Sequence, residues 1–111
     1  MTAEQINDIV EKVYTKASAA DLSKFPEKLA VQFNLVGRCK KFEGVFYLEV
    51  LNGVLSVKPY EYIDRDGLIT LSKTSLEEIL KKKITVEAAL AGTKVEAEGD
   101  MDKLMLLKNL L

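Results

Sequence analysis

The sequence contains no histidine. Histidine is the side chain that enzymes most often use as a general base near neutral pH, and it is also the commonest metal ligand in proteins. Its absence argues against proton-transfer catalysis and against a zinc-type site. We therefore predict that the protein is not an enzyme, has no catalytic residue, holds no metal and needs no cofactor.

Cysteine is nearly absent as well, since Cys39 is the only one. A single thiol cannot form an internal disulfide, which fits a reducing compartment. Residues 1–20 are too polar and too charged to be a signal peptide, and no apolar run approaches the ~20 residues needed to cross a bilayer. These absences predict a cytoplasmic protein.

A strong net charge is also missing, because 16 Lys and Arg residues are balanced by 17 Asp and Glu residues, which gives a formal net charge of −1. No overall field draws the chain to nucleic acid or to an anionic bilayer, so we predict no nucleic-acid partner and look for binding in local features. The 111 residues suffice for one domain that buries roughly two thirds of its unfolded surface. We expect a single domain over residues 1–111.

Two longer helices are predicted from capping residues and apolar spacing. The first covers about residues 3–19, because Thr2 and Gln5 form a capping box and apolar side chains recur at spacings of three and four. The second covers about residues 74–83, where apolar residues again share one face. Its N-cap is expected at Ser72, Thr74 or Ser75.

Two further helices are predicted near the C-terminus. Thr85 should cap a short helix over residues 86–91, and Gly92 is expected to end it as the left-handed residue that helices often have after their last turn. Asp100 should cap a terminal helix over residues 101–111.

The strands are predicted from apolar alternation and from one turn. Residues 29–36 alternate between apolar and other side chains, which predicts a strand with one buried face. Asn52 and Gly53 are the preferred pair for a type I′ hairpin, because both central residues need positive φ. That turn fixes the register so that Leu51 faces Val54, Val50 faces Leu55, Leu48 faces Val57 and Phe46 faces Pro59. Residues 68–72 and 93–98 are expected to form two more short strands.

This order of elements predicts an α+β fold in which helices cover one face of the sheet. The terminal segment is unusual, because seven of the eleven residues after Asp100 are Leu or Met and they spread around most of a helix. A surface helix normally has a clean polar face. One side of such a helix can rest on the other helices while another side lines an apolar site.

An ordered set of motifs in the chain resembles the sterol carrier protein 2 (SCP2) domain family. The stretch VQFNLVG and then FYLEVLNGVLSVKP are similar to the family's first strands and hairpin, and DGLITLS is similar to its fourth strand. The later motifs are an aspartate six residues before a serine, an alanine-rich helix, a glycine and a lysine that open the last strand, and a Gly-Asp pair that closes it. In this sequence they are Asp66 and Ser72, Ala88 and Ala89, Gly92 and Lys94, and Gly99 and Asp100.

The resemblance covers residues 3–111 and implies a five-stranded mixed sheet with helices over one face and an apolar tunnel between them. It also implies lipid binding and lipid transport, with a fatty acid, an acyl-CoA, a phospholipid or a sterol as ligand. Apolar side chains do not specify which of these binds. The sequence departs from the family where Lys83 replaces a frequent glycine and where Gly67 replaces a β-branched residue, and the end at residues 109–111 is not a peroxisomal Ser-Lys-Leu type of sequence.

If the tunnel exists, the inward-facing strand residues and the apolar helix residues line it. The predicted ligand-binding residues are Phe33, Leu35, Phe46, Leu48, Val50, Leu55, Val57, Leu76, Ile79, Leu80, Leu90, Met101, Leu104 and Met105. The methionines supply flexible, polarisable surface that adapts to different chains. The predicted partner is a lipid or fatty acyl ligand. A transient contact of such a carrier with a membrane stays open as a second interaction.

Other interpretations of the same residues stay open. Leu and Met at helical spacing also form solid cores, and the terminal helix or an outer patch of Tyr47, Leu51 and Val54 would suit a homodimer. A module of this fold could thus serve assembly by holding a partner protein or a second copy. An acyl-CoA or thioester enzyme is a third reading with less support.

Two local features have both a functional and a structural interpretation. Cys39 lies among Arg38, Lys40 and Lys41, which would favour its thiolate, but it has no histidine partner and fits an exposed turn. The lysines of residues 81–83 could meet lipid headgroups or phosphates, or could be a solvated helix end.

Two features of the segment between the hairpin and the fourth strand complete the set. Asp64 and Asp66 suggest the opening of a calcium loop, but Leu68 and Ser75 occupy positions that would have to be ligands, so a calcium loop is rejected. Tyrosines 60 and 62 could rim a tunnel entrance or simply pack in the loop.

Overall fold

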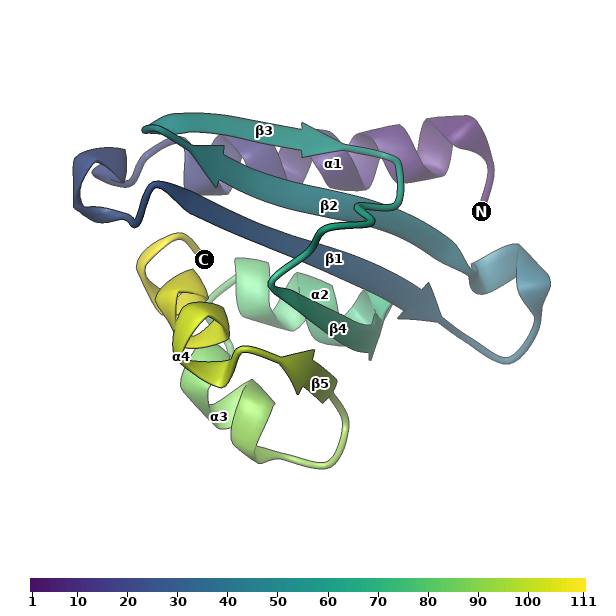
Figure 1. Cartoon of the computed structure of the whole chain (residues 1–111). Coiled ribbons are helices and arrows are strands. Elements are labelled where there is room, and N and C mark those ends of the chain that lie inside the picture. The colour runs from purple at the N-terminus through teal and green to yellow at the C-terminus, as the bar shows by residue number, and fades with distance from the viewer.

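The computed structural model describes residues 1–111 and contains one five-stranded sheet in the order β3-β2-β1-β4-β5 (Figure 1). Strand β1 is antiparallel to β2 and parallel to β4, and the other neighbouring pairs are antiparallel. The predicted mixed sheet of an α+β fold is confirmed. The strands are β1 Lys28–Val36, β2 Gly44–Leu51, β3 Val54–Lys58, β4 Gly67–Ser72 and β5 Glu96–Gly99.

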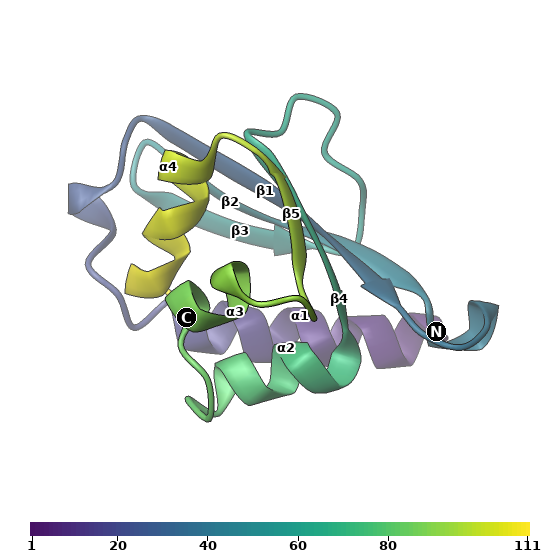
Figure 2. The same cartoon turned by 90° about the horizontal axis from the view of Figure 1, so that it is seen from below.

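The helices gather on one face of this sheet (Figure 2). Helices α1 and α2 run beneath the strands, and α3 and α4 lie toward one end. The helices are α1 Ala3–Ala17, α2 Lys73–Leu80, α3 Val86–Ala91 and α4 Met101–Leu104, which continues into a 3-10 helix over Met105–Asn109. The longest of them, α1, has 15 residues, and none combines the length and the hydropathy that a membrane crossing requires.

The hairpin between β2 and β3 has the predicted turn. Asn52 and Gly53 both have positive φ, 50° and 79°, as a type I′ turn requires. The three inner pairs are confirmed, namely Leu51 with Val54, Val50 with Leu55 and Leu48 with Val57. The pairing of Phe46 with Pro59 is not formed, because β3 ends at Lys58 and a proline has no N–H to donate to the ladder.

The predicted helix caps are present, but two helices end earlier than predicted. Thr2 and Gln5 form the capping box, with the Gln5 backbone N–H donating to Thr2 Oγ1 at 3.2 Å and the Thr2 N–H donating to Gln5 Oε1 at 2.9 Å. Helix α1 ends at Ala17 rather than residue 19. Helix α2, capped by Ser72, ends at Leu80, because the chain turns sharply through Lys82 at a φ of 61°.

Near the C-terminus, Thr85 and Asp100 cap α3 and α4 as predicted. Gly92 is not left-handed, since its φ is −87°, and the chain leaves α3 in an extended conformation. The last strand begins at Glu96 rather than at residue 93, so residues 93–95 approach the sheet without pairing to it.

The prediction that β1 has one buried face is wrong, because both of its faces are covered. Ala30 is 0% and Gln32 4% exposed, although both point away from the helices. Residues 59–66 cross this outer face between β3 and β4 (Figure 1). The backbone N–H of Tyr62 donates to Gln32 Oε1 at 2.9 Å, which satisfies the buried amide. Residues 59–66 therefore cover this face of β1, as the helices cover the other.

Candidate functional site

The space between the sheet and the helices is filled with apolar side chains and contains a small hollow. This cavity has a volume of about 10 Å³, roughly the minimum for one water molecule, and it offers a water no polar partner. The ten residues around it are all hydrophobic: Phe33, Ile69, Leu71, Leu76, Ile79, Val86, Ala89, Leu90, Leu107 and Leu111.

Four parts of the fold bring these side chains together. The sheet contributes Phe33 of β1 together with Ile69 and Leu71 of β4, which face the helices because strand side chains alternate. Helices α2 and α3 each contribute residues three apart on one face, and the segment after α4 contributes two leucines. The ring of Phe33 is stacked on that of Phe46 of β2 at 4.7 Å between centroids, which fixes its position as the floor of the cavity.

The structure distributes the predicted ligand-binding residues over four environments. Those at the cavity are Phe33, Leu76, Ile79 and Leu90. Those buried elsewhere in the same core are Leu35, Phe46, Leu48, Val50, Val57 and Leu104. Leu55 and Leu80 are half-buried and pack against the core at its margin. Met105, which is half-buried, and Met101, which is 42% exposed, lie outside the core cluster.

Six cavity residues were not among those predicted: Ile69, Leu71, Val86, Ala89, Leu107 and Leu111. The apolar spacing in the sequence indicates four of these six residues. The alternation in LITLS places Ile69 and Leu71 on one face once β4 is paired with β1. The spacing of Val86 and Ala89 is that of one helix face.

The tunnel that the family resemblance implies is not seen as open space in this structure. The side chains of the C-terminal segment occupy the region beside the cavity, where Leu104, Leu107, Leu110 and Leu111 are each 4% exposed or less. A pocket for a lipid-sized ligand needs roughly 300 Å³ or more. This conformation is therefore closed, and a ligand would have to displace these leucines.

Two contacts hold α4 against the sheet. Leu104 packs on Gly67, where a Cβ atom would lie 2.5 Å from Leu104 Cδ2, so the absence of a side chain at this strand position makes room for the leucine. Beside it, Lys103 Nζ donates to Asp66 Oδ1 at 2.9 Å. The other oxygen, Asp66 Oδ2, accepts from the backbone N–H of Ala30 at 2.8 Å. Asp66, the residue directly before β4, thus connects β1, β4 and α4.

These contacts determine the electrostatics of the pair. Burial of the Asp66 carboxyl opposes its ionisation, but the hydrogen bonds from Lys103 and Ala30 outweigh that effect and lower the pKa of Asp66 below its ordinary value of 3.8. The hydrogen bond to Asp66 in turn raises the pKa of Lys103 above 10.5. Both groups are charged at neutral pH, and the pair acts as a positioning contact rather than an acid-base site.

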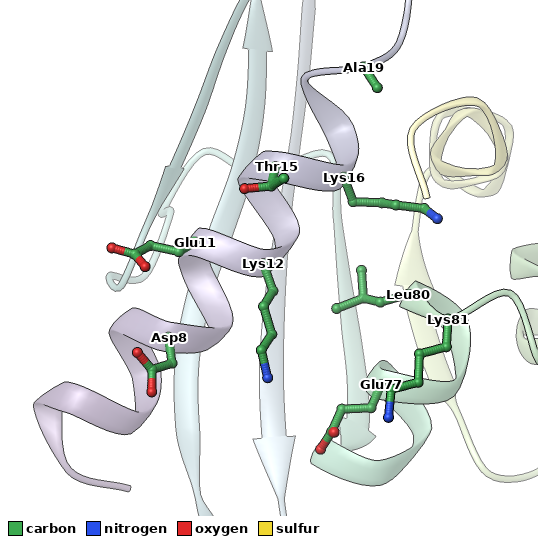
Figure 3. A pocket seen from close by; sticks show the side chains of 9 residues that line it. All are labelled: Asp8, Glu11, Lys12, Thr15, Lys16, Ala19, Glu77, Leu80 and Lys81. Carbon is green, nitrogen blue, oxygen red and sulfur yellow. The ribbon is translucent and has the colours of Figure 1, made fainter.

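An open groove of about 600 Å³ between α1 and α2 is the alternative site (Figure 3). Lys12, Lys16 and Leu80 point into it from the two helices. Its walls carry three acids and three lysines, and Ala19 and Leu80 are its two hydrophobic residues. Balanced charge gives no preference for an anion, and an acyl chain lying in this open groove would stay in contact with water along one side. The groove therefore fits a lipid tail poorly.

The outer face of the sheet carries a polar cluster. Tyr62 lies edge-on to Tyr47 at 5.0 Å between ring centroids, and its hydroxyl donates to Glu49 Oε2 at 2.6 Å. This hydrogen bond, together with burial, raises the pKa of Tyr62 to about 12. Tyr62 therefore packs on the face opposite the cavity and does not rim an entrance to it, while Tyr60 is 64% exposed.

The remaining candidates of the sequence are surface features. Cys39 is exposed and free. Asp64 pairs with Lys28 at 3.0 Å, and no group of three or more cysteine or acidic side chains is placed to hold a metal ion. Leu51 and Val54 at the hairpin are 40% and 63% exposed, so the outer apolar patch exists, but it is confined to the tip of one turn.

Comparison with known proteins adds to this geometry. The sequence matches the family model described as the SCP-2 sterol transfer family over residues 6–111. No curated protein sequence matches the chain significantly.

Solved structures share the fold. Sterol carrier protein 2 from Yarrowia lipolytica, in its apo form, has 20% sequence identity and a TM-score of 0.67, with 95% of this chain and 85% of that chain aligned. A solution structure of SCP2L2 from Aedes aegypti, described as palmitated, has 26% identity and a TM-score of 0.66, with 97% of this chain and 92% of that chain aligned.

A stereoselective inverting sec-alkylsulfatase from Pseudomonas sp. is also similar, with 22% identity and a TM-score of 0.69. The alignment covers 86% of this chain but only 15% of the sulfatase. The likeness is therefore to one part of a much longer enzyme.

Proposed function

The chain belongs to the SCP-2 sterol transfer family, and we propose that it binds a lipid reversibly, with the acyl or other apolar part in the core between the sheet and the helices. The observation that carries the proposal is the wholly apolar cavity formed by Phe33, α2, α3 and the C-terminal leucines. A ligand held there would be recognised by its apolar length and girth. The family match favours this function over the assembly module.

The energetics allow a ligand to open the closed core. Transferring an acyl chain of about 16 carbons into an apolar site is favourable by roughly 13 kcal/mol before ordering costs, at ~0.8 kcal/mol per methylene. Exposing Leu107 and Leu111 to make room would cost about 1.5–3 kcal/mol each. The balance still favours the bound state by roughly 7–10 kcal/mol before ordering costs, so dense packing in the free protein does not preclude binding.

We also propose that residues 1–111 act as one binding unit without catalysis of their own. The 22 buried residues of the core form one continuous cluster drawn from every strand except β5 and from all four helices, which supports a single unit. A cytoplasmic setting is proposed on account of the free thiol of Cys39, which fits a reducing compartment.

The test combines extraction of bound lipid with direct binding. Organic extraction of freshly purified protein followed by mass spectrometry should yield a fatty acid or another lipid. Titration with palmitate and palmitoyl-CoA should raise the unfolding temperature, because a ligand that binds the folded state stabilises it by RT ln(1 + [L]/Kd). No lipid in the extract and no stabilisation by any amphiphile would exclude the proposal.

A matched pair of variants locates the site. Ala89→Phe adds a ring at the cavity, where Ala89 is 4% exposed, and should abolish palmitate binding at a stability cost of about 1–3 kcal/mol. Ala88→Phe adds the same ring to the exposed side of α3 and should bind palmitate as the wild type does. A folded Ala89→Phe protein with unchanged palmitate affinity would show that the ligand lies elsewhere.

A further inference from the structure

One end of the molecule carries a concentrated positive charge. Two shallow hollows of about 980 and 520 Å³ adjoin there and share Lys41, Phe42 and Lys73. They lie where the start of α1, the 3-10 turn Lys40–Phe42 and the tip of β1 meet (Figure 1, Figure 2). The residues that line them include four cations, Arg38, Lys40, Lys41 and Lys73, and one acid, Glu77.

These cations have no carboxylate partner. The two salt bridges of the protein join Lys28 to Asp64 and Lys103 to Asp66, both away from this end. All four cations are exposed. With a net charge of −1 for the chain, such clustering is a local property of this surface. Unpaired cations on one face are complementary to an extended anionic surface.

Apolar side chains lie among the cations. Phe42 is 45% and Val36 43% exposed. Phe42 packs against Gly37, where the lack of a side chain lets the ring lie close to the backbone, and Lys41 Nζ is 5.2 Å from the centre of the same ring. A cationic surface with a fixed, partly exposed aromatic ring combines attraction to anionic headgroups with shallow apolar insertion.

The cationic end also adjoins the apolar core. Ser72, Lys73 and Thr74 line the hollows, while Leu71 and Leu76 on either side of that segment border the cavity. One short stretch of β4 and α2 therefore separates the surface from the interior.

We propose that this surface, which we call the basic end and which comprises Val36, Arg38, Lys40, Lys41, Phe42 and Lys73, docks on the anionic face of a lipid bilayer. The inference rests on the proposed function in that a lipid carrier must touch the membrane with which it exchanges its ligand. Each lysine near an anionic membrane surface contributes roughly fivefold to affinity, so three of them contribute about a hundredfold.

The experiment is vesicle co-sedimentation. Wild-type protein should sediment with phosphatidylcholine vesicles that contain phosphatidylserine and not with pure phosphatidylcholine, and about 0.5 M salt should weaken the binding. The variant Lys40→Ala/Lys41→Ala/Lys73→Ala should lose about a hundredfold in affinity. Lys12→Ala/Lys16→Ala/Lys81→Ala, which removes the same charge from the α1–α2 groove, should bind as the wild type does. Phe42→Ala should lower the part of the binding that survives high salt.

A second measurement keeps this inference separate from the proposed function. Palmitate binding in solution, without vesicles, should be equal in the wild type and in the basic-end triple variant. If the protein binds palmitate but sediments with neither kind of vesicle, the docking surface is refuted and the lipid site stands. If anionic vesicles bind but palmitate does not, the docking surface stands and the proposed function fails.

Two further outcomes would overturn the docking proposal. Equal loss of vesicle binding in both triple variants would show that total charge rather than the basic end is responsible. A single-stranded oligonucleotide that binds more tightly than anionic vesicles at the same salt would show that the surface serves nucleic acid. Cys39, the one thiol of the chain, lies within this end and is exposed, so an environment-sensitive dye attached there should report insertion into anionic vesicles.

Discussion

Lys103 and Asp66 join the C-terminal helix to the sheet, with 2.9 Å between Nζ and Oδ1. The lysine side chain is 34% and the aspartate side chain 16% exposed, so the contact lies at the rim of the core. The two leucines of this segment that border the cavity, Leu107 and Leu111, lie four and eight residues after Lys103. The contact therefore restrains the segment that a ligand must displace.

Lys103→Met should accelerate lipid uptake, because it removes the ion pair and keeps the length and the apolar stem of the side chain. Stopped-flow mixing with a fluorescent fatty acid measures the rate. Lys108→Met changes an exposed lysine of the same segment that has no acidic partner, and it should leave the rate unchanged. Equal rates for Lys103→Met and the wild type would show that the pair does not limit opening.

The stability that Asp66 contributes should depend on pH in a defined direction. Its pKa is lower in the folded protein than the ordinary 3.8, so its contribution is fully present above 3.8 and is lost as the pH falls through the lowered value. Urea denaturation of the wild type and of Asp66→Asn should therefore show a constant difference in unfolding free energy from neutral pH down to about 5, and a shrinking difference below 3.8. A difference that instead grew on acidification would contradict the assigned sign.

Tyr62 should titrate at unusually high pH. The hydrogen bond to Glu49 is the main reason that the pKa of Tyr62 is about 12. Ultraviolet titration of phenolate should show a late component that Tyr62→Phe removes and that Glu49→Gln shifts to lower pH. The raised pKa implies a stability contribution that is present below 10.0 and lost as the pH rises toward 12. A Glu49→Gln protein with an unshifted late component would refute the assigned cause.

Local chemistry allowed much of the fold to be predicted. The positive φ required at Asn52 and Gly53 fixes the hairpin register, and the side chains of Thr2, Ser72, Thr85 and Asp100 satisfy backbone N–H groups where their helices begin. Such signals depend on neighbours a few residues away, so they can be recognised in the sequence. The covered outer face of β1 depends on residues 59–66 lying across Gln32. Tyr62 and Gln32, which form the contact, are 30 residues apart in the sequence, and the alternation within one strand does not encode such a contact.

The candidate site was less predictable for a related reason. Periodicity shows which face of an element is apolar. It indicates the inward-facing positions, and the structure places four of them at the cavity: Phe33, Leu76, Ile79 and Leu90. It does not show how tightly opposing side chains interlock, and the remaining volume of about 10 Å³ depends on that. The pairing of Asp66 with Lys103, 37 residues apart, also follows only from the placement of α4 on β4.

Gly67 and Leu104 give the sharpest test of how α4 is seated. Gly67→Ala should destabilise the protein by about 1–3 kcal/mol, because the new Cβ atom would lie 2.5 Å from Leu104 Cδ2 and force the fully buried leucine to move. Leu104→Ala alone should cost about 2–5 kcal/mol by leaving a cavity. In the double variant the added methyl group occupies part of that cavity, so its cost in urea denaturation should be smaller than the sum of the two single costs.

Gly53→Ala is the control for this cycle. Its backbone has a φ of +79° and no atom lies within 4 Å of the added methyl group, so it is destabilised by backbone strain rather than by collision. Combining Gly53→Ala with Leu104→Ala should therefore give additive costs, since the two sites share no contact. If Gly67→Ala and Leu104→Ala were equally additive, Leu104 would not rest on Gly67 in solution.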